Sequence, residues 1–306
     1  MLITLAKCVL ALVVALGLLV GCQSIRHGGT QALPEQGEGS LRIATYNVHY
    51  IILRREAGAW SVGDWDRRKR PLDLAFKEVG ADVIGFQEME SFGGGSGNDV
   101  NLTLDWLLTN NPGYSAAAVG DPAMFPSTQP ILYRTDRLSP IDQGWFFFSD
   151  TPDVIYSRTF NGSFPAFASW AEFTDARTGA IFKVVNVHTD YASLSNRVQS
   201  TALIVDRISP WIDAGETVFV IGDLNARFGD QVVEMLQDAG LTFAPVSGAT
   251  YHFNRGINLF AAIDHIAVAG DATLANPPVV VRKKYDGEWP TDHYPVVADY
   301  VLGTVR

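Results

Sequence analysis

After residue 40 the chain alternates between short apolar runs, rich in β-branched and aromatic residues, and polar turns. Runs of this kind are typical of strands that are buried on both faces of a sheet. The pattern predicts strands at 41–48, 82–88, 114–119, 130–134, 139–148, 167–173, 180–188, 216–221, 261–268, 278–282 and 296–301. Wider spacing of the apolar residues predicts helices at about 66–79, 99–110, 193–212 and 231–239. Ser193 or Ser195 is a possible N-cap of the third helix.

The order of these elements indicates the fold class. Helices and strands intermix throughout, and several strands follow one another directly. This favours an α/β protein with mixed sheets covered by helices over a simple doubly wound parallel sheet. Pro71 falls near the start of the first predicted helix, where it is tolerated. The aromatic block Trp145-Phe146-Phe147-Phe148 invites a membrane-contact interpretation, but within a run of strands it is more often core.

The first 20 residues differ from the rest of the chain. Lys7 is their single charge, and the apolar run from Val9 to Val20 is shorter than the roughly 20 residues needed to span a bilayer. This is the pattern of a secretory signal peptide rather than of a transmembrane helix. Residues 23 to about 40 are rich in glycine and polar side chains, so we expect a flexible tether there.

The end of this leader, Leu19-Val20-Gly21-Cys22, resembles the lipobox of bacterial lipoproteins. The resemblance implies cleavage before Cys22 and attachment there of a diacylglyceryl group and an amide-linked acyl chain such as palmitate, which together anchor a protein stably. Gln23 resembles the outer-membrane sorting pattern. We expect a signal peptide at 1–21, a lipid-anchored tether at 22–40 and one folded domain at 41–306, attached to the bacterial cell envelope at the outer membrane. The alternative is an ordinary signal peptide with a chance cysteine.

Composition and charge limit the function further. With 306 residues, 47% of them hydrophobic, the chain can form one large core. A net charge of -10 argues against a protein that holds nucleic acid mainly through a basic surface. A nuclease stays possible, because bound metal ions reverse the charge locally. Cys8 and Cys22 are the only cysteines, so the folded domain has no disulfide and no thiol chemistry. Without heptads or a large amphipathic helix, we expect a monomer.

The stretch around residue 220 suggests chemistry most directly. The run 218–221 is typical of a buried strand, which Gly222 ends, and Asp223 and Asn225 then share one face. The carboxylate can orient or deprotonate a water, and the amide can donate to a phosphoryl oxygen, so the pair suits phosphoester hydrolysis. The alternative is an Asx turn in which both side chains bond the local backbone.

Other polar residues also stand at the ends of apolar strands. They supply hard oxygen ligands and two imidazoles, without a thiol nucleophile. These residues are Asn47, Glu88, His188, Asp190, Asp264, Asp292 and His293. The glycine run 93–97 beside Glu88 lacks the strand–loop–helix setting and Lys-Ser/Thr pair of a P-loop, so we expect a mobile loop there and no phosphate cradle.

Taken in order, these motifs resemble those of the endonuclease/exonuclease/phosphatase superfamily. They lie at 43–48, 82–88, 130–134, 185–190, 221–226, 263–266 and 291–296. The superfamily includes pancreatic-deoxyribonuclease-like nucleases, abasic-site endonucleases, inositol polyphosphate 5-phosphatases and bacterial sphingomyelinases. The resemblance covers about residues 41 to 303 and implies a four-layer αββα sandwich of two mixed β-sheets flanked by helices. It indicates the chemistry better than the substrate.

The resemblance also implies a metal site. Glu88, supported by Asn47, would bind Mg²⁺ or Mn²⁺ against a phosphate oxygen, and Asp292 would be a further carboxylate on the metal side. Gln129 stands where an acidic residue is common, and Ala166 follows Pro165 where an arginine is common. The first departure leaves one metal or two open, and the second removes a possible phosphate-side cation.

The remaining roles implied by the resemblance concern water and phosphate. Asp223 would activate the attacking water and Asn225 would donate to the phosphoryl group. His293, held in its tautomer by Asp264, would stabilise the transition state. His188 would be a phosphate ligand or the general acid, and Asn47, Asn225 and His188 would line the substrate site. Asp190 is either a partner behind this site or a turn cap. His49, Arg197 and the loop 251–255 lie near motifs and could contact substrate, although exposed histidines and helix-surface arginines are common.

These observations leave several functions open. The first hypothesis is a lipid-anchored, metal-dependent phosphoesterase that cleaves a phosphodiester by direct attack of water, most simply a nuclease. The second is a phosphomonoesterase or a phospholipid phosphodiesterase, which the acidic charge and the tether favour. The third is a non-catalytic binding module with the same fold. That hypothesis predicts an incomplete set of site residues, whereas the set is complete.

Overall fold

The computed structural model describes residues 2–29, 31–93 and 100–303. Among them, two large mixed sheets form the domain. The first sheet has the strand order β13 (Ala272–Leu274), β15 (Val296–Leu302), β1 (Leu41–Asn47), β3 (Val83–Gln87), β6 (Ile131–Arg134) and β5 (Tyr114–Ala117), and β14 (Val279–Val280) also pairs with β15. The second sheet has the order β11 (Thr242–Phe243), β12 (Asp264–Ala269), β10 (Thr217–Asp223), β9 (Ile181–His188), β8 (Phe167–Asp175) and β7 (Leu138–Phe147). A small parallel pair joins β2 (Ile51–Ile52) to β4 (Ser91–Phe92).

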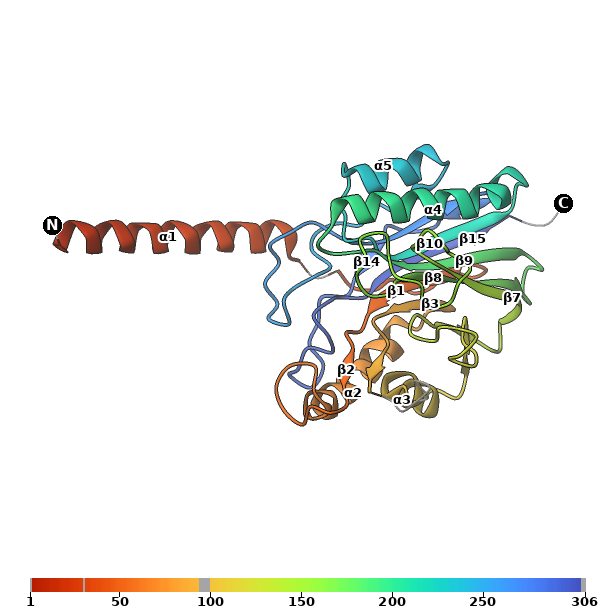
Figure 1. Ribbon diagram of the computed structural model, residues 1–306, viewed down its shortest axis with the longest axis horizontal. Coiled ribbons are helices and arrows are strands. Elements are labelled where there is room, and N and C mark those ends of the chain that lie inside the picture. The colour runs from red at the N-terminus through yellow and green to blue at the C-terminus, as the bar shows by residue number, and fades with distance from the viewer. Residues whose placement is uncertain (1, 30, 94–99, 304–306) are drawn as a thin grey trace.

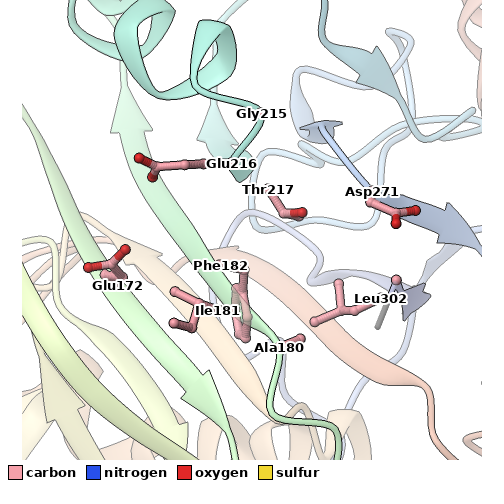
Figure 2. Close-up of a pocket in the computed structure, with 10 residues that line it drawn as sticks. Glu172, Ala180, Ile181, Phe182, Gly215, Glu216, Thr217, Asp271 and Leu302 are labelled. Carbon is pink, nitrogen blue, oxygen red and sulfur yellow. The ribbon is translucent and has the colours of Figure 1, made fainter. Parts of the chain in front are cut away.

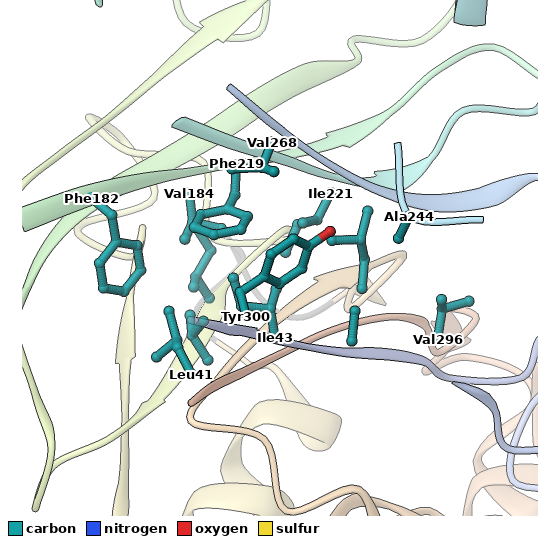
Figure 3. Packing of buried hydrophobic residues seen from close by; sticks show 14 of the residues in the cluster. Leu41, Ile43, Phe182, Val184, Phe219, Ile221, Ala244, Val268, Val296 and Tyr300 are labelled. Atoms are coloured by element: carbon teal, nitrogen blue, oxygen red, sulfur yellow. The ribbon is translucent and has the colours of Figure 1, made fainter. Parts of the chain in front are cut away.

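The four helices of the domain cover the outer faces of these sheets (Figure 1). α2 (Val62–Val79) and α3 (Leu102–Asn110) pack against the first sheet, and α4 (Leu194–Asp213) and α5 (Gln231–Asp238) pack against the second. The inner faces bury a shared apolar core in which Phe219 and Ile221 face Ile43 and Tyr300 (Figure 3). The predicted four-layer αββα sandwich is therefore confirmed.

Strand direction gathers the polar strand ends at one edge of the sandwich. β1 runs parallel to β3, and β9 runs parallel to β10. Asn47 ends β1 opposite Gln87, while Asp223 ends β10 opposite both His188 and Asp264. Because the carboxyl ends of parallel strands meet at the same edge, one polar site forms there.

Helix caps fix the boundaries that the apolar pattern leaves open. The Ser61 side chain accepts a hydrogen bond from the Asp64 amide, so α2 begins at Val62, several residues before the predicted start. Pro71 consequently lies in the middle of α2 and not in its first turn, which corrects the prediction. Ser193 caps α4 by accepting from the Asn196 amide, as predicted.

Several strand boundaries also differ from the pattern. β12 begins at Asp264 and β14 covers only Val279–Val280, because apolar residues outside the sheet ladder extend both runs in the sequence. Phe146, Phe147 and Phe148 are buried, which confirms the core interpretation of the aromatic block. Most of the glycine run at 93–97 lies outside the described residues, as does the predicted helix start at 99.

The N-terminal segment forms one helix, α1 (Leu2–His27), which projects from the domain (Figure 1). Its segment Lys7–His27 is long and apolar enough to cross a membrane, a test that signal sequences near an N-terminus also pass. The helix continues beyond Cys22, and part of the predicted tether contacts the domain. The Pro34 carbonyl accepts from Arg42 at 2.7 Å, and Leu33 packs against the core beneath α2. Leu33 and Pro34 of the predicted tether therefore contact the domain.

Candidate active site

A buried polar network joins the two sheets beneath the site. The Gln87 amide donates to the Asn186 side chain at 2.6 Å and to the Thr45 hydroxyl at 3.0 Å. Asn186 in turn donates to the backbone carbonyl of Phe86 at 2.8 Å. Because buried amides are costly unless their hydrogen bonds are made, this network fixes how β3 and β9 lie against each other.

Asn47 connects the predicted metal ligand with the predicted base. Its Nδ2 lies 3.1 Å from Glu88 Oε1 and 3.2 Å from Asp223 Oδ2. Asp223 is buried, whereas 27% of the Glu88 side chain is exposed. Glu88 has a positive φ of 55°, an uncommon backbone conformation that turns the chain at the end of β3. The carboxylate that a metal ion can reach therefore lies at the mouth of the site.

Both predicted imidazoles face the Asp223 carboxylate. Nε2 of His188 lies 3.7 Å from Asp223 Oδ2, and Nε2 of His293 lies 3.8 Å from the same oxygen. His188 also lies 3.9 Å from Glu88 Oε1 and is partly exposed. The three side chains surround a position where a phosphoryl group can contact two imidazoles and a carboxylate together.

Asp264 orients His293. The two side chains share a hydrogen bond of 2.9 Å between Nδ1 and Oδ2, and both are buried. Burial alone would lower the pKa of His293, but the carboxylates of Asp264, Asp223 and Asp292 outweigh burial and raise this pKa to about 10. His293 is therefore a cation at neutral pH whose Nε2 is left to face an anion.

For the pKa of Asp223, burial and the neighbouring histidines act in the directions opposite to those of burial and the carboxylates on His293. Burial and the neighbouring Asp264 charge raise its pKa to about 6, against the attraction of His293 and His188. A carboxyl group with this pKa is ionised at neutral pH and more basic than an exposed aspartate. Such a group suits a general base.

Asn225 and Asp223 form the predicted pair but with local bonds as well. Asn225 has a φ of 45°, its amide nitrogen donates to Asp223 Oδ1 at 2.8 Å, and its Nδ2 donates to the Thr189 carbonyl at 2.9 Å. The Asx turn and the catalytic arrangement thus coexist. The second hydrogen of the Asn225 side-chain amide is left to reach a phosphoryl oxygen.

Thr291 connects Asp292 to the end of β1. The Thr291 hydroxyl is 3.2 Å from Asp292 Oδ1 and donates to the Asn47 carbonyl at 3.1 Å. This bond ties the loop before β15 to the end of β1. Thr291 is a positioning residue. It lies in the motif at 291–296, but the sequence predicted no role for it.

Asp190 takes the second of its two predicted roles. Its carboxylate accepts from the backbone amides of Ala192 and Ser193, which makes it the cap of the turn before α4. His49 is buried rather than exposed, and burial, with the nearby Arg68 charge, lowers its pKa to about 3. It therefore lies behind the site as a neutral ring and is not positioned as a substrate contact.

Arg68 and Tyr251 support the site. The sequence predicted no role for Arg68, and it placed Tyr251 only in a loop that could contact substrate. Arg68 on α2 is buried and donates to the carbonyls of Val48 and His49, holding the chain after β1. Tyr251 places its ring 5.0 Å from that of His293. Arg68 could have been noticed as a charge on the apolar face of a helix, whereas the contact of Tyr251 depends on tertiary structure.

Two groups of side chains are candidates for binding a divalent cation. Ligand atoms of Asp223, Asp264 and His293 lie within 4.8 Å of one another. However, Asp264 and His293 already bond each other and are buried, so the partly exposed Glu88 with Asp292, supported by Asn47 through its Nδ2, is the better candidate. Carboxylate and amide oxygens are the ligands that Mg²⁺ and Mn²⁺ prefer.

One hollow includes a residue of the site, and a second contains Glu90, which follows Glu88 by two residues in the sequence. The first, of about 360 Å³, includes Asn225 with Arg197, Arg227, Tyr251 and Phe260. The other has a volume of about 470 Å³ and is lined in part by Glu90, Asp105, Asp121 and Tyr156. Arg197 thus borders the site, as one of its two predicted alternatives allowed.

A further cavity of about 390 Å³ lies at the opposite ends of β9 and β10 (Figure 2). Glu172, Glu216 and Asp271 are around it, and Lys183 pairs with both glutamates. It contains none of the predicted site residues. The site at the carboxyl ends of the strands is therefore the candidate active site.

A four-layer sandwich whose central strands bring carboxylates, two imidazoles and a side-chain amide together at one edge has the arrangement of a phosphoric ester hydrolase. Residues 44–293 match the model of the Endonuclease/Exonuclease/phosphatase family, and the chain belongs to that family. Members of this family are phosphoester hydrolases that depend on divalent metal ions. The sequence-based assignment is confirmed.

Solved structures share the fold across most of the chain. A mannosyl-6-phosphatase of Bacteroides thetaiotaomicron is 24% identical, with a TM-score of 0.72 over 86% of this chain and 100% of that one. The catalytic domain of human Nocturnin is 12% identical, with a TM-score of 0.60 over 87% and 94% of the two chains. TDP2 of D. rerio is 16% identical, with a TM-score of 0.60 over 85% and 98%. No curated protein sequence matches the chain.

Proposed function

We propose that this phosphoesterase hydrolyses a phosphodiester by direct attack of water. The observation that carries the proposal is the position of the buried Asp223 carboxylate, within 3.8 Å of both His188 and His293 and linked through Asn47 to Glu88. A base, a cation and amide donors then converge on one phosphoryl group, the requirement for stabilising a charge that develops in the transition state.

Four side chains have roles in this reaction. Asp223 orients the water and accepts its proton, while protonated His293 donates through Nε2 to a phosphoryl oxygen. Asn225 donates its remaining amide hydrogen to the same group. His188, partly exposed beside Glu88, contacts the phosphate or protonates the leaving oxygen.

Glu88, with Asn47 and Asp292, would hold the divalent cation, for which we propose Mg²⁺ or Mn²⁺. When bound, the ion supplies positive charge to a phosphate oxygen and to the leaving oxygen. Gln129 does not provide a further carboxylate. Its side-chain amide donates to the Phe167 carbonyl, and its backbone carbonyl accepts from the Ser169 hydroxyl. The residue at this position therefore supports one cation rather than two.

The two hollows support a diester, because a diester carries a substituent on each side of the phosphorus. Asp105 and Asp121 around the hollow that includes Glu90 would repel the further phosphates of a nucleic-acid strand. A small phosphodiester or a phospholipid headgroup is therefore favoured over the nuclease substrate that the motifs alone suggested.

Phosphomonoester hydrolysis is the second candidate function. Its support is the likeness to the structure described as a mannosyl-6-phosphatase. Lipidation at Cys22 and attachment to the outer membrane remain proposals, supported by the leader sequence and by the exposure of Cys22.

The test is a substrate panel with the full chain in detergent and Mg²⁺. The panel contains bis-p-nitrophenyl phosphate, p-nitrophenyl phosphate, sphingomyelin, inositol phosphates and plasmid DNA, with Asp223→Ala and His293→Ala as controls. We expect diesters to be cleaved faster than the monoester and DNA to be a poor substrate. Preferential cleavage of the monoester would support the second candidate, and efficient DNA cleavage lost in both variants would restore the nuclease hypothesis.

A further inference from the structure

The end of α1 is held against the rim of the active site. The Ala249 amide donates to the His27 carbonyl at 2.8 Å, and the Asn258 amide donates to the Ser24 hydroxyl at 3.4 Å. Arg282 donates to the Gly29 carbonyl at 3.0 Å. Figure 1 shows this end of α1 beside the loop between β11 and β12, the loop that also contains Tyr251.

This contact fixes where a membrane anchor leaves the domain. The anchor is either the apolar helix itself or acyl chains on Cys22, and Cys22 precedes Ser24 by two residues. Two residues of extended chain span at most about 7 Å. With either anchor, the bilayer surface lies next to residues 248–258.

Cations gather at the same place. Arg26, Arg227 and Arg282 lie near His27, and they lower its pKa in addition to the effect of burial. Arg255 is exposed in the adjoining turn. Basic residues immediately beyond an apolar segment are attracted to anionic lipid headgroups.

Exposed aromatic rings lie between these cations. Phe253 is 36% exposed and Phe260 is 40% exposed, with 6.0 Å between their ring centroids. The Arg227 guanidinium lies 4.9 Å from the centroid of Phe260. We call Arg227, Phe253, Arg255 and Phe260 the rim patch. Aromatic rings beside basic side chains are typical of surfaces that sit at the headgroup level of a bilayer.

We propose that the rim patch lies on an anionic lipid bilayer, so that the active site opens into the headgroup layer. The patch is continuous with the site. Tyr251 lies 4.5 Å from the ring of Phe253 and 5.0 Å from that of His293. Arg227 and Phe260 border the same hollow as Asn225. The phosphoesters within reach are then those of membrane lipids or of molecules attached to them.

The exposed apolar residue Ile181 lies in a different setting. Ile181 is 51% exposed at the opposite end of the sandwich, beside Glu172 and Glu216. Acidic neighbours disfavour an anionic bilayer, so Ile181 provides a matched control for the loss of an exposed apolar side chain.

The test is hydrogen exchange of the full chain in lipid nanodiscs, which needs no catalytic activity and therefore does not depend on the proposed function. Exchange is measured in nanodiscs of phosphatidylcholine with and without phosphatidylglycerol, and in detergent. We expect slower exchange over residues 251–260 in the anionic nanodiscs only, with no change over 176–181. The protection should be lost in Phe253→Ser/Phe260→Ser, weakened in Arg227→Gln/Arg255→Gln and retained in Ile181→Ser.

Unfolding temperatures of all variants establish that the patch variants remain folded. The proposal is overturned if the full chain does not associate with nanodiscs, or if it associates while residues 251–260 exchange as in detergent. Equal protection by neutral nanodiscs would overturn the requirement for anionic lipid.

Discussion

At the scale of single residues, the site depends on two raised pKa values, one of a base and one of an acid. His293 is held protonated by the carboxylates around it, and Asp223 is made more basic by burial and by Asp264. A base and an acid can then coexist at neutral pH, 3.8 Å apart. Asp264 contributes to both shifts without reaching the substrate, so it is a positioning residue.

Asp223→Asn removes the base while keeping the shape of the side chain. We expect kcat for bis-p-nitrophenyl phosphate to fall by about 10² to 10⁴-fold, the usual contribution of a general base. Asp190→Asn is the matched control, because Asp190 caps a turn outside the reacting group, and its kcat should change little. Equal losses in the two variants would contradict the role of Asp223.

Asp264→Asn should change the pH dependence of activity. In the wild-type protein, activity falls at low pH as Asp223 is protonated near pH 6, and at high pH as His293 loses its proton near pH 10. Without the Asp264 charge the pKa of His293 falls, so the alkaline limit should move to lower pH. The profile of kcat/KM against pH measures this, and an unchanged alkaline limit would mean that another group determines it.

The same shift bears on stability. A raised histidine pKa stabilises the fold fully below the unfolded value of 6.5, and this contribution is lost as pH rises through about 10. Between these limits the wild-type free energy of unfolding should decline more steeply than that of Asp264→Asn.

At the scale of elements, the site is a consequence of where the central strands end. β10 and β9 pair in parallel register until Asp223 lies opposite His188, and Gly222 makes the close approach possible. A β-carbon at Gly222 would lie 1.9 Å from the Val187 carbonyl oxygen, and its φ of 143° also favours glycine.

Gly222→Ala should therefore destabilise the protein by at least about 2 kcal/mol in urea unfolding, since the clash is with backbone. Gly229→Ala is the control. It has a φ of 85° but no atom within 4 Å of its added β-carbon, so only the conformational cost of about 1 to 2 kcal/mol is expected. Equal losses would show that conformation and not the clash limits position 222.

The sequence predicted these strand ends well for physical reasons. Buried strands are apolar throughout, so a polar residue at the end of such a run, as at Asn47, Glu88 and Asp223, stands out. Helix boundaries were less accurate. The start of α2 depends on the Ser61 hydroxyl bonding the Asp64 amide, a contact that apolar periodicity does not report.

Residues that act through tertiary contacts could not be predicted. The hydrogen bond between Gln87 and Asn186 joins positions 99 residues apart, and the contact of Tyr251 with His293 depends on how two loops meet. The family motifs, by contrast, placed Asp264 beside His293 in advance, because they record a contact that local pattern alone does not contain.

At the scale of the whole molecule, the two sheets are also joined at the end opposite the site. Arg137 is fully buried and pairs with Asp82 before β3 at 2.6 Å and with Asp175 of β8 at 2.8 Å. These pairs connect one sheet to the other beyond the apolar core. The sandwich is thus held at one end by ion pairs and at the other by the polar network under the site.

Arg137→Leu should destabilise the protein by about 3 to 5 kcal/mol, because it leaves two buried carboxylates without their charged partner. Arg134→Leu is the matched control. Arg134 pairs with Asp136 at 2.8 Å on the surface, and such pairs contribute about 0 to 1 kcal/mol. Urea unfolding of both variants measures the difference, and similar values would mean that the buried pairs do not join the sheets as described.

We propose that Glu88 binds a cation on which hydrolysis depends. The most direct measurement is the rate of bis-p-nitrophenyl phosphate hydrolysis by the full chain after chelation, as Mg²⁺ is returned, for the wild-type protein and for Glu88→Gln. We predict no activity in chelator, full recovery of the wild type with Mg²⁺, and either no recovery or recovery only at much higher Mg²⁺ in Glu88→Gln. Hydrolysis that persists in chelator, or a Glu88→Gln variant with the same Mg²⁺ dependence as the wild type, would contradict the account.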